Sequence, residues 1–130
     1  MYSISITHKN GSNWFTASVD GRQIYDAGGF AACDNVLVEL PLPNAGENDI
    51  NFQMIPNVPA GFGDWQIIFK LIGRNGEAAS PEFNHSGTNN EIGHMLFVIN
   101  TNRSDQENYE YNHKLLWLYE HPNQPYPGLH

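Results

Sequence analysis

Two tryptophans in this sequence directly follow a polar residue that could bind the hydroxyl groups of a sugar. The pairs are Asn13-Trp14 and Asp64-Trp65. A sugar ring stacks its apolar face on an aromatic ring, while amide and carboxylate groups hydrogen-bond to its hydroxyls. Trp14 and the polar residue Thr16 are two positions apart and would share one face of a strand. We therefore expect the ring of Trp14 to be more exposed than that of Trp65.

Trp65 is the first residue of the apolar stretch "WQIIFKLI", where every second residue from Trp65 onward is apolar: Ile67, Phe69 and Leu71. This pattern predicts that Trp65 starts a buried strand. The preceding loop "VPAGFGD" would then offer polar atoms from its last residue and a ring from its phenylalanine, and the loop "TNNE" would offer further amides. The predicted ligand-binding residues are Asn13, Trp14, Phe62, Asp64, Asn89 and Asn90.

Two amide-rich and acidic loops, "NAGEND" and "TNNE", contain the oxygen ligands that Ca²⁺ prefers. Neither has the spacing of a helix-flanked calcium loop, and turn formation by Asn and Asp explains both of them. We therefore expect no cofactor and keep Ca²⁺ as the alternative. The metal-binding candidates are Glu47, Asp49, His85, Glu91 and His94.

The six histidines include no H-x-H pair that one strand could present on a single face. His85 and His94 flank the loop that contains "SGTNNEIG", and they would approach each other if this loop closed a hairpin. The only cysteine, Cys33, follows two alanines, which favours a packed thiol over a nucleophile.

No zinc knuckle, nucleophile elbow or phosphate-binding loop occurs in the sequence. A carboxylate pair for glycoside hydrolysis could come from Glu39, Glu82 or Glu110, although these residues also suit the outward faces of strands. We lean towards a protein without catalytic activity and keep a small enzyme with a histidine and carboxylate site as one alternative.

The chain has 130 residues and a net charge of −8, from six Lys and Arg against fourteen Asp and Glu. The few basic residues are dispersed, which disfavours nucleic acid as a partner. Neither a signal peptide nor a stretch long and apolar enough to span a membrane is present, and a single cysteine allows no internal disulfide. We expect a cytoplasmic protein, with release by a route that needs no signal peptide as the alternative.

Short alternating segments joined by turn residues indicate an all-β protein. The turn signals Asn10-Gly11 and Asp20-Gly21 predict a three-strand meander over the first 26 residues. Further strands are expected in "VLVEL", "INFQMI", "WQIIFKLI" and "MLFVIN", the last buried on both faces, with a short edge strand near Phe83. These segments predict a single antiparallel β-sandwich of jelly-roll type over residues 1–120, followed by an extended Pro-rich tail at 121–130.

Residues 104–120 fit two structures. Ser104 and Glu107 match a capping box, which marks the start of a helix. Tyr109, Tyr111 and the aromatic residues that follow alternate with period two and favour a strand. We favour the strand.

Three functional hypotheses follow. The first is a lectin-like module that recognises carbohydrate through loop aromatic and Asp or Asn residues. The second is a self-assembling interaction protein or a structural accessory protein, of the kind found in virions or toxin complexes, and the third is the small enzyme. The sequence therefore predicts carbohydrate or protein as the partner, and it allows a homo-oligomer.

Overall fold

The computed structural model of this chain describes residues 2–9, 12–26, 33–57, 65–87 and 93–127. Near the ends of several strands it describes the backbone but not the side chains. These positions are 8, 9, 12–15, 25, 26, 33–36, 54–57, 65, 85–87 and 93.

In the described residues the chain forms eight strands followed by one helix. The strands are β1 (Ser3–Lys9), β2 (Ser12–Val19), β3 (Arg22–Asp26), β4 (Cys33–Glu39), β5 (Glu47–Asn57), β6 (Trp65–Ile72), β7 (Phe83–Gly87) and β8 (Gly93–Asn100). The helix is α1 (Asp105–Glu120).

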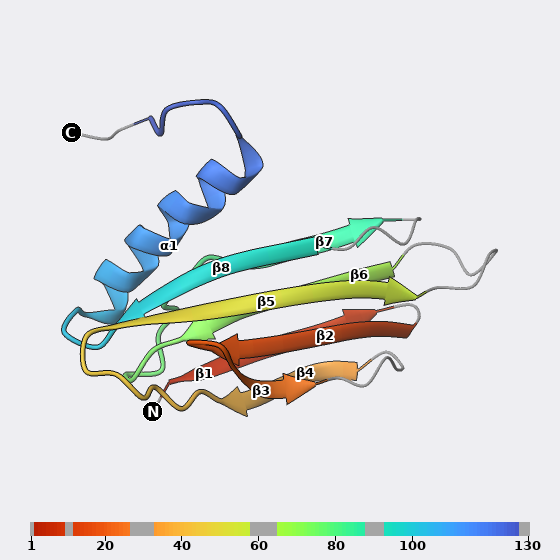
Figure 1. Cartoon of the computed structure of the whole chain (residues 1–130), viewed down its shortest axis with the longest axis horizontal. Coiled ribbons are helices and arrows are strands. Elements are labelled where there is room, and N and C mark those ends of the chain that lie inside the picture. Colours follow the sequence, from red (N-terminus) through yellow and green to blue (C-terminus); the bar gives the residue numbers. More distant parts are fainter. Residues whose placement is uncertain (1, 10–11, 27–32, 58–64, 88–92, 128–130) are drawn as a thin grey trace.

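The strands form two four-stranded sheets that pack face to face (Figure 1). Sheet A has the order β4-β1-β6-β7 and sheet B has the order β3-β2-β5-β8, and every pairing is antiparallel. The prediction of an all-β sandwich is confirmed, and so is the short edge strand near Phe83. The jelly-roll connectivity that we expected is not confirmed by this strand order.

The two ends of the sandwich differ in what they carry. At one end, which we name the loop end, β1, β3, β5 and β7 finish and β2, β4, β6 and β8 begin. At the opposite end, which we name the helix end, β8 leads into α1 (Figure 1).

The predicted meander of the first three strands is wrong. β1 pairs with β4 and β6 in sheet A, whereas β2 pairs with β3 and β5 in sheet B. The chain therefore crosses between the sheets after β1, which a turn signal at Asn10-Gly11 does not reveal. The second turn is confirmed: Asp20 and Gly21 have φ values of 48° and 87°, and they join β2 to β3.

The core lies between the two sheets and is formed by alternate residues of the strands. Ile67, Phe69 and Leu71 of β6 are almost fully buried, as their alternation predicts. They meet Ile50 and Phe52 of β5 from the opposite sheet, within one cluster of buried apolar side chains. This core fixes which face of each strand points outward.

The prediction of a strand over residues 104–120 is wrong, because these residues form α1. The side chain of Ser104 accepts a hydrogen bond from the backbone N–H of Glu107, and the Glu107 carboxylate accepts one from the backbone N–H of Ser104. This reciprocal cap satisfies two donors that a helix start leaves free. The aromatic alternation misled because two asparagines, Asn108 and Asn112, are buried on the helix face that packs on the sandwich.

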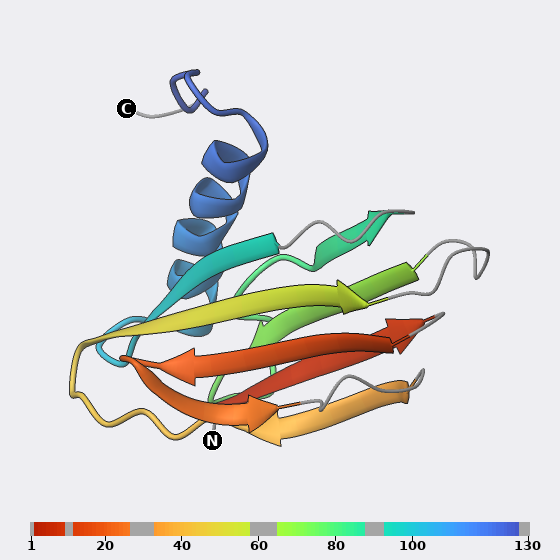
Figure 2. The ribbon, with the colours of Figure 1, turned by 45° about the vertical axis from the view of Figure 1, so that its right-hand side comes forward.

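Asn108 and Asn112 attach α1 to the free edge of β8. The Asn108 side chain accepts a hydrogen bond from the Asn100 N–H at 2.9 Å and donates one to the Asn100 carbonyl at 3.1 Å. Asn112 bonds in the same way to both backbone groups of Val98, at 2.8 Å each, and also donates to the Ala79 carbonyl. The helix thus packs beside the part of β8 that lies towards the helix end (Figure 2).

The predicted burial of "MLFVIN" on both faces holds for only part of β8. Met95, Phe97 and Ile99 face the core, and Val98 on the other face is buried, with α1 bound to its backbone. Leu96 lies further from the start of the helix and stays 41 % exposed. In the part of the chain that the structure describes, no helix has the length and apolarity to cross a membrane.

The cap of α1 makes part of the stability depend on pH. Hydrogen bonds from the backbone and side chain of Ser104 lower the pKa of the Glu107 carboxyl below its ordinary value. A carboxylate whose pKa falls on folding stabilises the folded state above its unfolded pKa, and this contribution is lost as the pH falls through the folded pKa. We expect Glu107→Gln, which can keep the cap, to flatten the loss of stability below about pH 4.5. Urea denaturation of both proteins across acidic pH checks this, and parallel curves for the two would contradict it.

Candidate functional site

The outer face of sheet B presents two rows of mostly uncharged polar side chains. Alternate residues of β2 and β5 face the core, so the residues between them face outward. The strand register aligns these outward residues across the sheet. The first row contains Gln23, Ser18, Asn51 and Leu96, and the second contains Thr16, Gln53 and His94.

The spacing of the strands gives this face a defined size. Neighbouring strands lie about 4.8 Å apart, and residues two positions apart on one strand lie about 7 Å apart. The first row spans all four strands of sheet B and is therefore about 14 Å long. The surface is hollowed here, with a volume of about 320 Å³ lined by side chains of both rows. We name it the amide face, for its polar residues Thr16, Ser18, Gln23, Asn51, Gln53 and His94.

The polar side chains of the amide face are free to bind a ligand. Among the described residues, none of the six side chains has a hydrogen-bond partner within the protein. The asparagines at the helix end differ, because Asn48, Asn108 and Asn112 all hold backbone groups in place. Within the described residues, these asparagines therefore serve the structure at the helix end, whereas the polar side chains of the amide face bind no other part of the protein.

An apolar wall borders the amide face along β8 and α1. Leu96 and Tyr119 are 41 % and 45 % exposed, and they belong to a second hollow of about 420 Å³. This hollow shares Asn51 and His94 with the amide face, so the two form one continuous surface. Tyr119 packs edge-on against Phe83 at 5.6 Å between ring centroids, which limits the movement of its ring. The wall consists of Leu96, Leu115, Leu118 and Tyr119.

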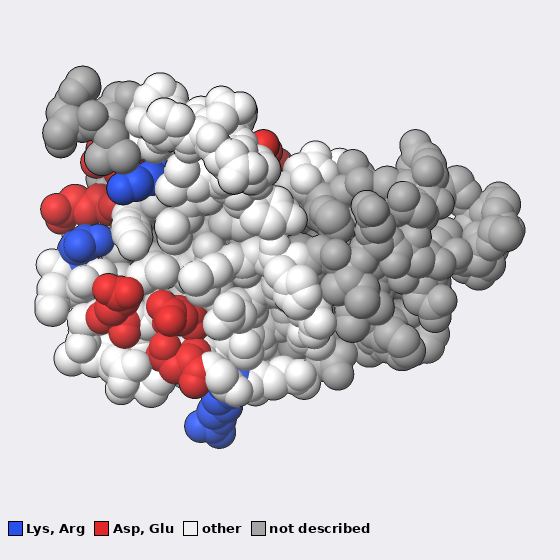
Figure 3. Space-filling view, turned by 45° about the horizontal axis from the view of Figure 1, so that its top comes forward, with Lys and Arg blue, Asp and Glu red and all other residues white. Residues whose placement is uncertain are grey.

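Charge is distributed unevenly around this surface. The described surface beside α1 is largely uncharged, and Asp and Glu side chains gather towards the helix end (Figure 3). Glu47 and Asp49 are exposed on β5 at that end, and Asp20 accepts hydrogen bonds from the Asp49 N–H and the Asn44 amide. The amide face therefore suits a ligand whose polar groups are themselves uncharged.

The structure describes only part of the ligand site that the sequence predicts. Asn13 and Trp14 lie on β2, where their backbones pair with Pro56 and Ile55 of β5, but their side chains are not described. Trp14 is two residues from Thr16 along this strand. Phe62, Asp64, Asn89 and Asn90 lie outside the described residues. Trp65 does begin β6, as predicted.

The metal-binding candidates are not brought together where the structure describes them. Within the described residues, no group of three or more His, Cys, Asp or Glu side chains could hold a metal ion. His85 and His94 lie on β7 and β8, which belong to different sheets, so their loop does not close the hairpin considered above. Glu91 and the side chain of His85 lie outside the described part.

Five polar residues of the amide face are not among the predicted ligand-binding residues, namely Thr16, Ser18, Gln23, Asn51 and Gln53. The alternation along the strands could have indicated these residues. In β2 and β5, residues with hydroxyl or amide groups alternate with the residues that face the core. What the sequence could not show is that β2 and β5 are neighbours, since the chain leaves sheet B after β3 and returns to it only after β4. No known family model, curated protein or solved structure matches this chain.

Proposed function

We propose that this chain is a carbohydrate-binding module without catalytic activity, and that the amide face is its binding surface. The observation that carries the proposal is the set of six polar side chains without a hydrogen-bond partner among the described residues, next to a wall with an exposed tyrosine. Asn51 and His94 belong to both parts of this surface and would contact the ligand where the two parts meet.

The chemistry of the surface supports a neutral sugar over other small ligands. Each sugar hydroxyl can donate and accept a hydrogen bond, and amide side chains do both at adjacent atoms. Asn51 and Gln53 lie on the same strand about 7 Å apart, a spacing that allows contacts to separate parts of one ligand. The ring of Tyr119 offers the apolar surface on which a sugar ring stacks.

We expect this module to bind a neutral oligosaccharide and Asn51→Ala to weaken that binding about tenfold. An unpaired buried hydroxyl costs about 1–3 kcal/mol, and 1.4 kcal/mol corresponds to a factor of ten in affinity. A glycan array would identify the ligand, and calorimetric titration would measure the affinity of the variant. Asn84→Ala is the matched control, because Asn84 is also an exposed asparagine in a strand but lies in sheet A.

Two outcomes would contradict this proposal in different ways. Absence of binding across a broad array would contradict carbohydrate recognition itself. Binding that survives Asn51→Ala combined with Gln53→Ala, but is lost in Trp14→Ala or Asp64→Ala, would move the site to the loop residues that the sequence predicts.

A further inference from the structure

A short connection, which we name the arch, crosses from sheet A to sheet B at the helix end of the sandwich (Figure 1). The segment 40–46 carries the chain from β4 in sheet A to β5 in sheet B. It is fixed at one end by the hydrogen bond from the Leu40 N–H to the Tyr2 carbonyl at 2.9 Å. At the other end Asn44 donates to the Asp20 carboxylate and accepts at its carbonyl from the Asn48 side chain. Residues 41–43 span the distance between these two attachments.

The arch has the sequence Pro41-Leu42-Pro43, which suits it to lining an apolar pocket. Proline has no backbone N–H, so only Leu42 brings a donor that needs a partner. The ring of each proline also fixes its φ angle and limits movement of the arch. A pocket of about 340 Å³ lies against it, and Val19 and Ile24 of sheet B complete the apolar lining. This volume is at the lower end of the range for small-molecule sites, about 300–1,000 Å³.

One positive charge at this pocket has no partner among the residues that the structure describes. Among the residues lining it, Arg22 is the basic one, and no described residue forms a hydrogen bond or ion pair with its guanidinium. The acidic lining residue, Asp20, is already used: one oxygen accepts from the Asp49 N–H and the other from the Asn44 side chain. Glu39 lies with Arg22 along the adjoining hollow but does not line the pocket itself.

We infer that this pocket binds a small apolar carboxylate, with its hydrocarbon part against Val19, Ile24 and Leu42 and its carboxylate on Arg22. The arch is attached at both ends, so the apolar part of the site exists before the ligand arrives. Arginine binds a carboxylate through two parallel hydrogen bonds, which selects an acid over an alcohol or an amine. This site is separate from the amide face and does not depend on the proposed carbohydrate binding.

Octanoate is a suitable probe, with octanol and octylamine of the same chain length as comparisons. In ¹H–¹⁵N correlation spectra we expect millimolar octanoate to shift the amide signals of Val19, Ile24 and Leu42, and the other two compounds to bind more weakly. Arg22→Gln should weaken octanoate binding about tenfold, because it removes a charged hydrogen-bond partner. Arg103→Gln is the matched control, because it removes the same charge from an exposed arginine at the start of α1.

Ile24→Trp, which fills the pocket with a larger side chain, should abolish octanoate binding in a protein whose spectrum remains dispersed. Three results would overturn the inference. The first is no shift of these signals at millimolar octanoate, and the second is equal binding of octylamine. The third is an affinity for octanoate that is unchanged in Arg22→Gln. Octanoate-induced shifts at Leu96 and Leu118 would then place its binding in the hollow beside α1.

Discussion

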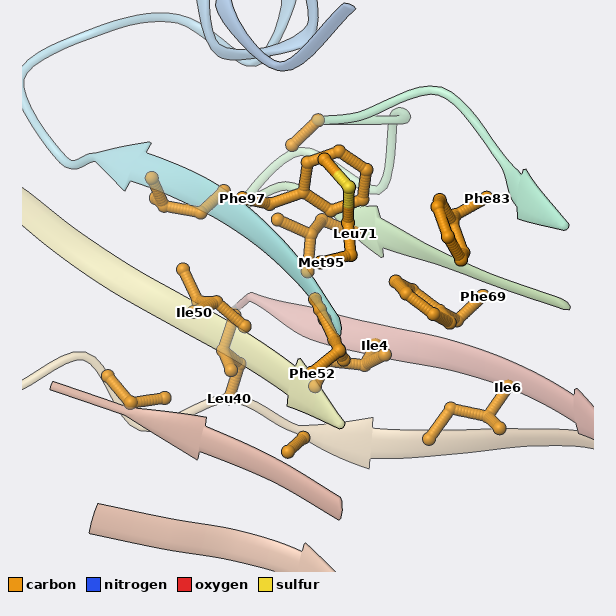
Figure 4. Close-up of a cluster of buried hydrophobic side chains, with 14 of the residues drawn as sticks. Ile4, Ile6, Leu40, Ile50, Phe52, Phe69, Leu71, Phe83, Met95 and Phe97 are labelled. Carbon is orange, nitrogen blue, oxygen red and sulfur yellow. The ribbon is translucent and has the colours of Figure 1, made fainter. Parts of the chain in front are cut away.

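Phe69→Ala is expected to lower the free energy of unfolding by about 3–5 kcal/mol, which is the usual range for truncating a buried phenylalanine. Phe69 is 1 % exposed and lies at the centre of the aromatic core (Figure 4). Its ring centroid is 4.0 Å from that of Phe52, 5.0 Å from that of Phe83 and 6.1 Å from that of Phe97. The substitution therefore removes contacts from both sheets at once.

Urea denaturation followed by tryptophan fluorescence would measure this loss. A domain of this size is stable by about 5–15 kcal/mol, so the variant should unfold at a much lower urea concentration. Leu37→Ala is the control, since Leu37 is 68 % exposed on β4 and should change stability by less than about 0.5 kcal/mol. A loss below about 1 kcal/mol for Phe69→Ala would show that this aromatic cluster is not the packed centre of the fold.

Asn112→Ala is expected to cost about 3–5 kcal/mol for a different reason. Asn112 is fully buried, and its side chain satisfies the N–H and carbonyl of Val98 and the carbonyl of Ala79. Each buried group left without a partner costs about 1–3 kcal/mol. Because these bonds hold α1 on the sandwich, the variant should also lose helical signal in circular dichroism at lower urea concentrations than the parent protein.

Asn112→Asp separates the role of the donor from the shape of the side chain. The carboxylate can still accept from the Val98 N–H, but it faces two carbonyl oxygens to which the asparagine donates. We expect this variant to be at least as unstable as Asn112→Ala at neutral pH, and to recover partly in acid, where the protonated acid can donate. Asn102→Ala, at an exposed asparagine, should have little effect. Equal stability of all three variants would contradict the role assigned to Asn112.

Strand alternation predicted most of the sandwich because burial on one face leaves a direct trace in the sequence. Ile67, Phe69 and Leu71 showed their common face in this way, and the turn at Asp20-Gly21 was marked by its residue types. Which strands are neighbours leaves no such trace. A turn between β1 and β2 has similar residues whether the strands pair in one sheet or cross to the other, so the meander was predicted wrongly.

The helix was missed because its buried face is polar. Asn108 and Asn112 have the i, i+4 spacing of one helix face, but asparagine is usually exposed and does not count as core in a hydrophobic pattern. Their burial is favourable only because they bind free backbone groups at the edge of a strand, and this contact depends on the tertiary structure. The amide face was missed for the same kind of reason, because the outward residues of β2 and β5 become one surface only after the strands pair.

The attachment of α1 to β8 also bears on strand addition at the edge of sheet B. An edge strand offers a row of free N–H and carbonyl groups that can recruit a strand from another molecule and start aggregation. Asn108 and Asn112 occupy these groups at Asn100 and Val98, so the helix replaces the next strand without offering a new edge. Detaching α1 would therefore free the edge groups of Val98 and Asn100, and a strand from another molecule could then pair with this part of β8.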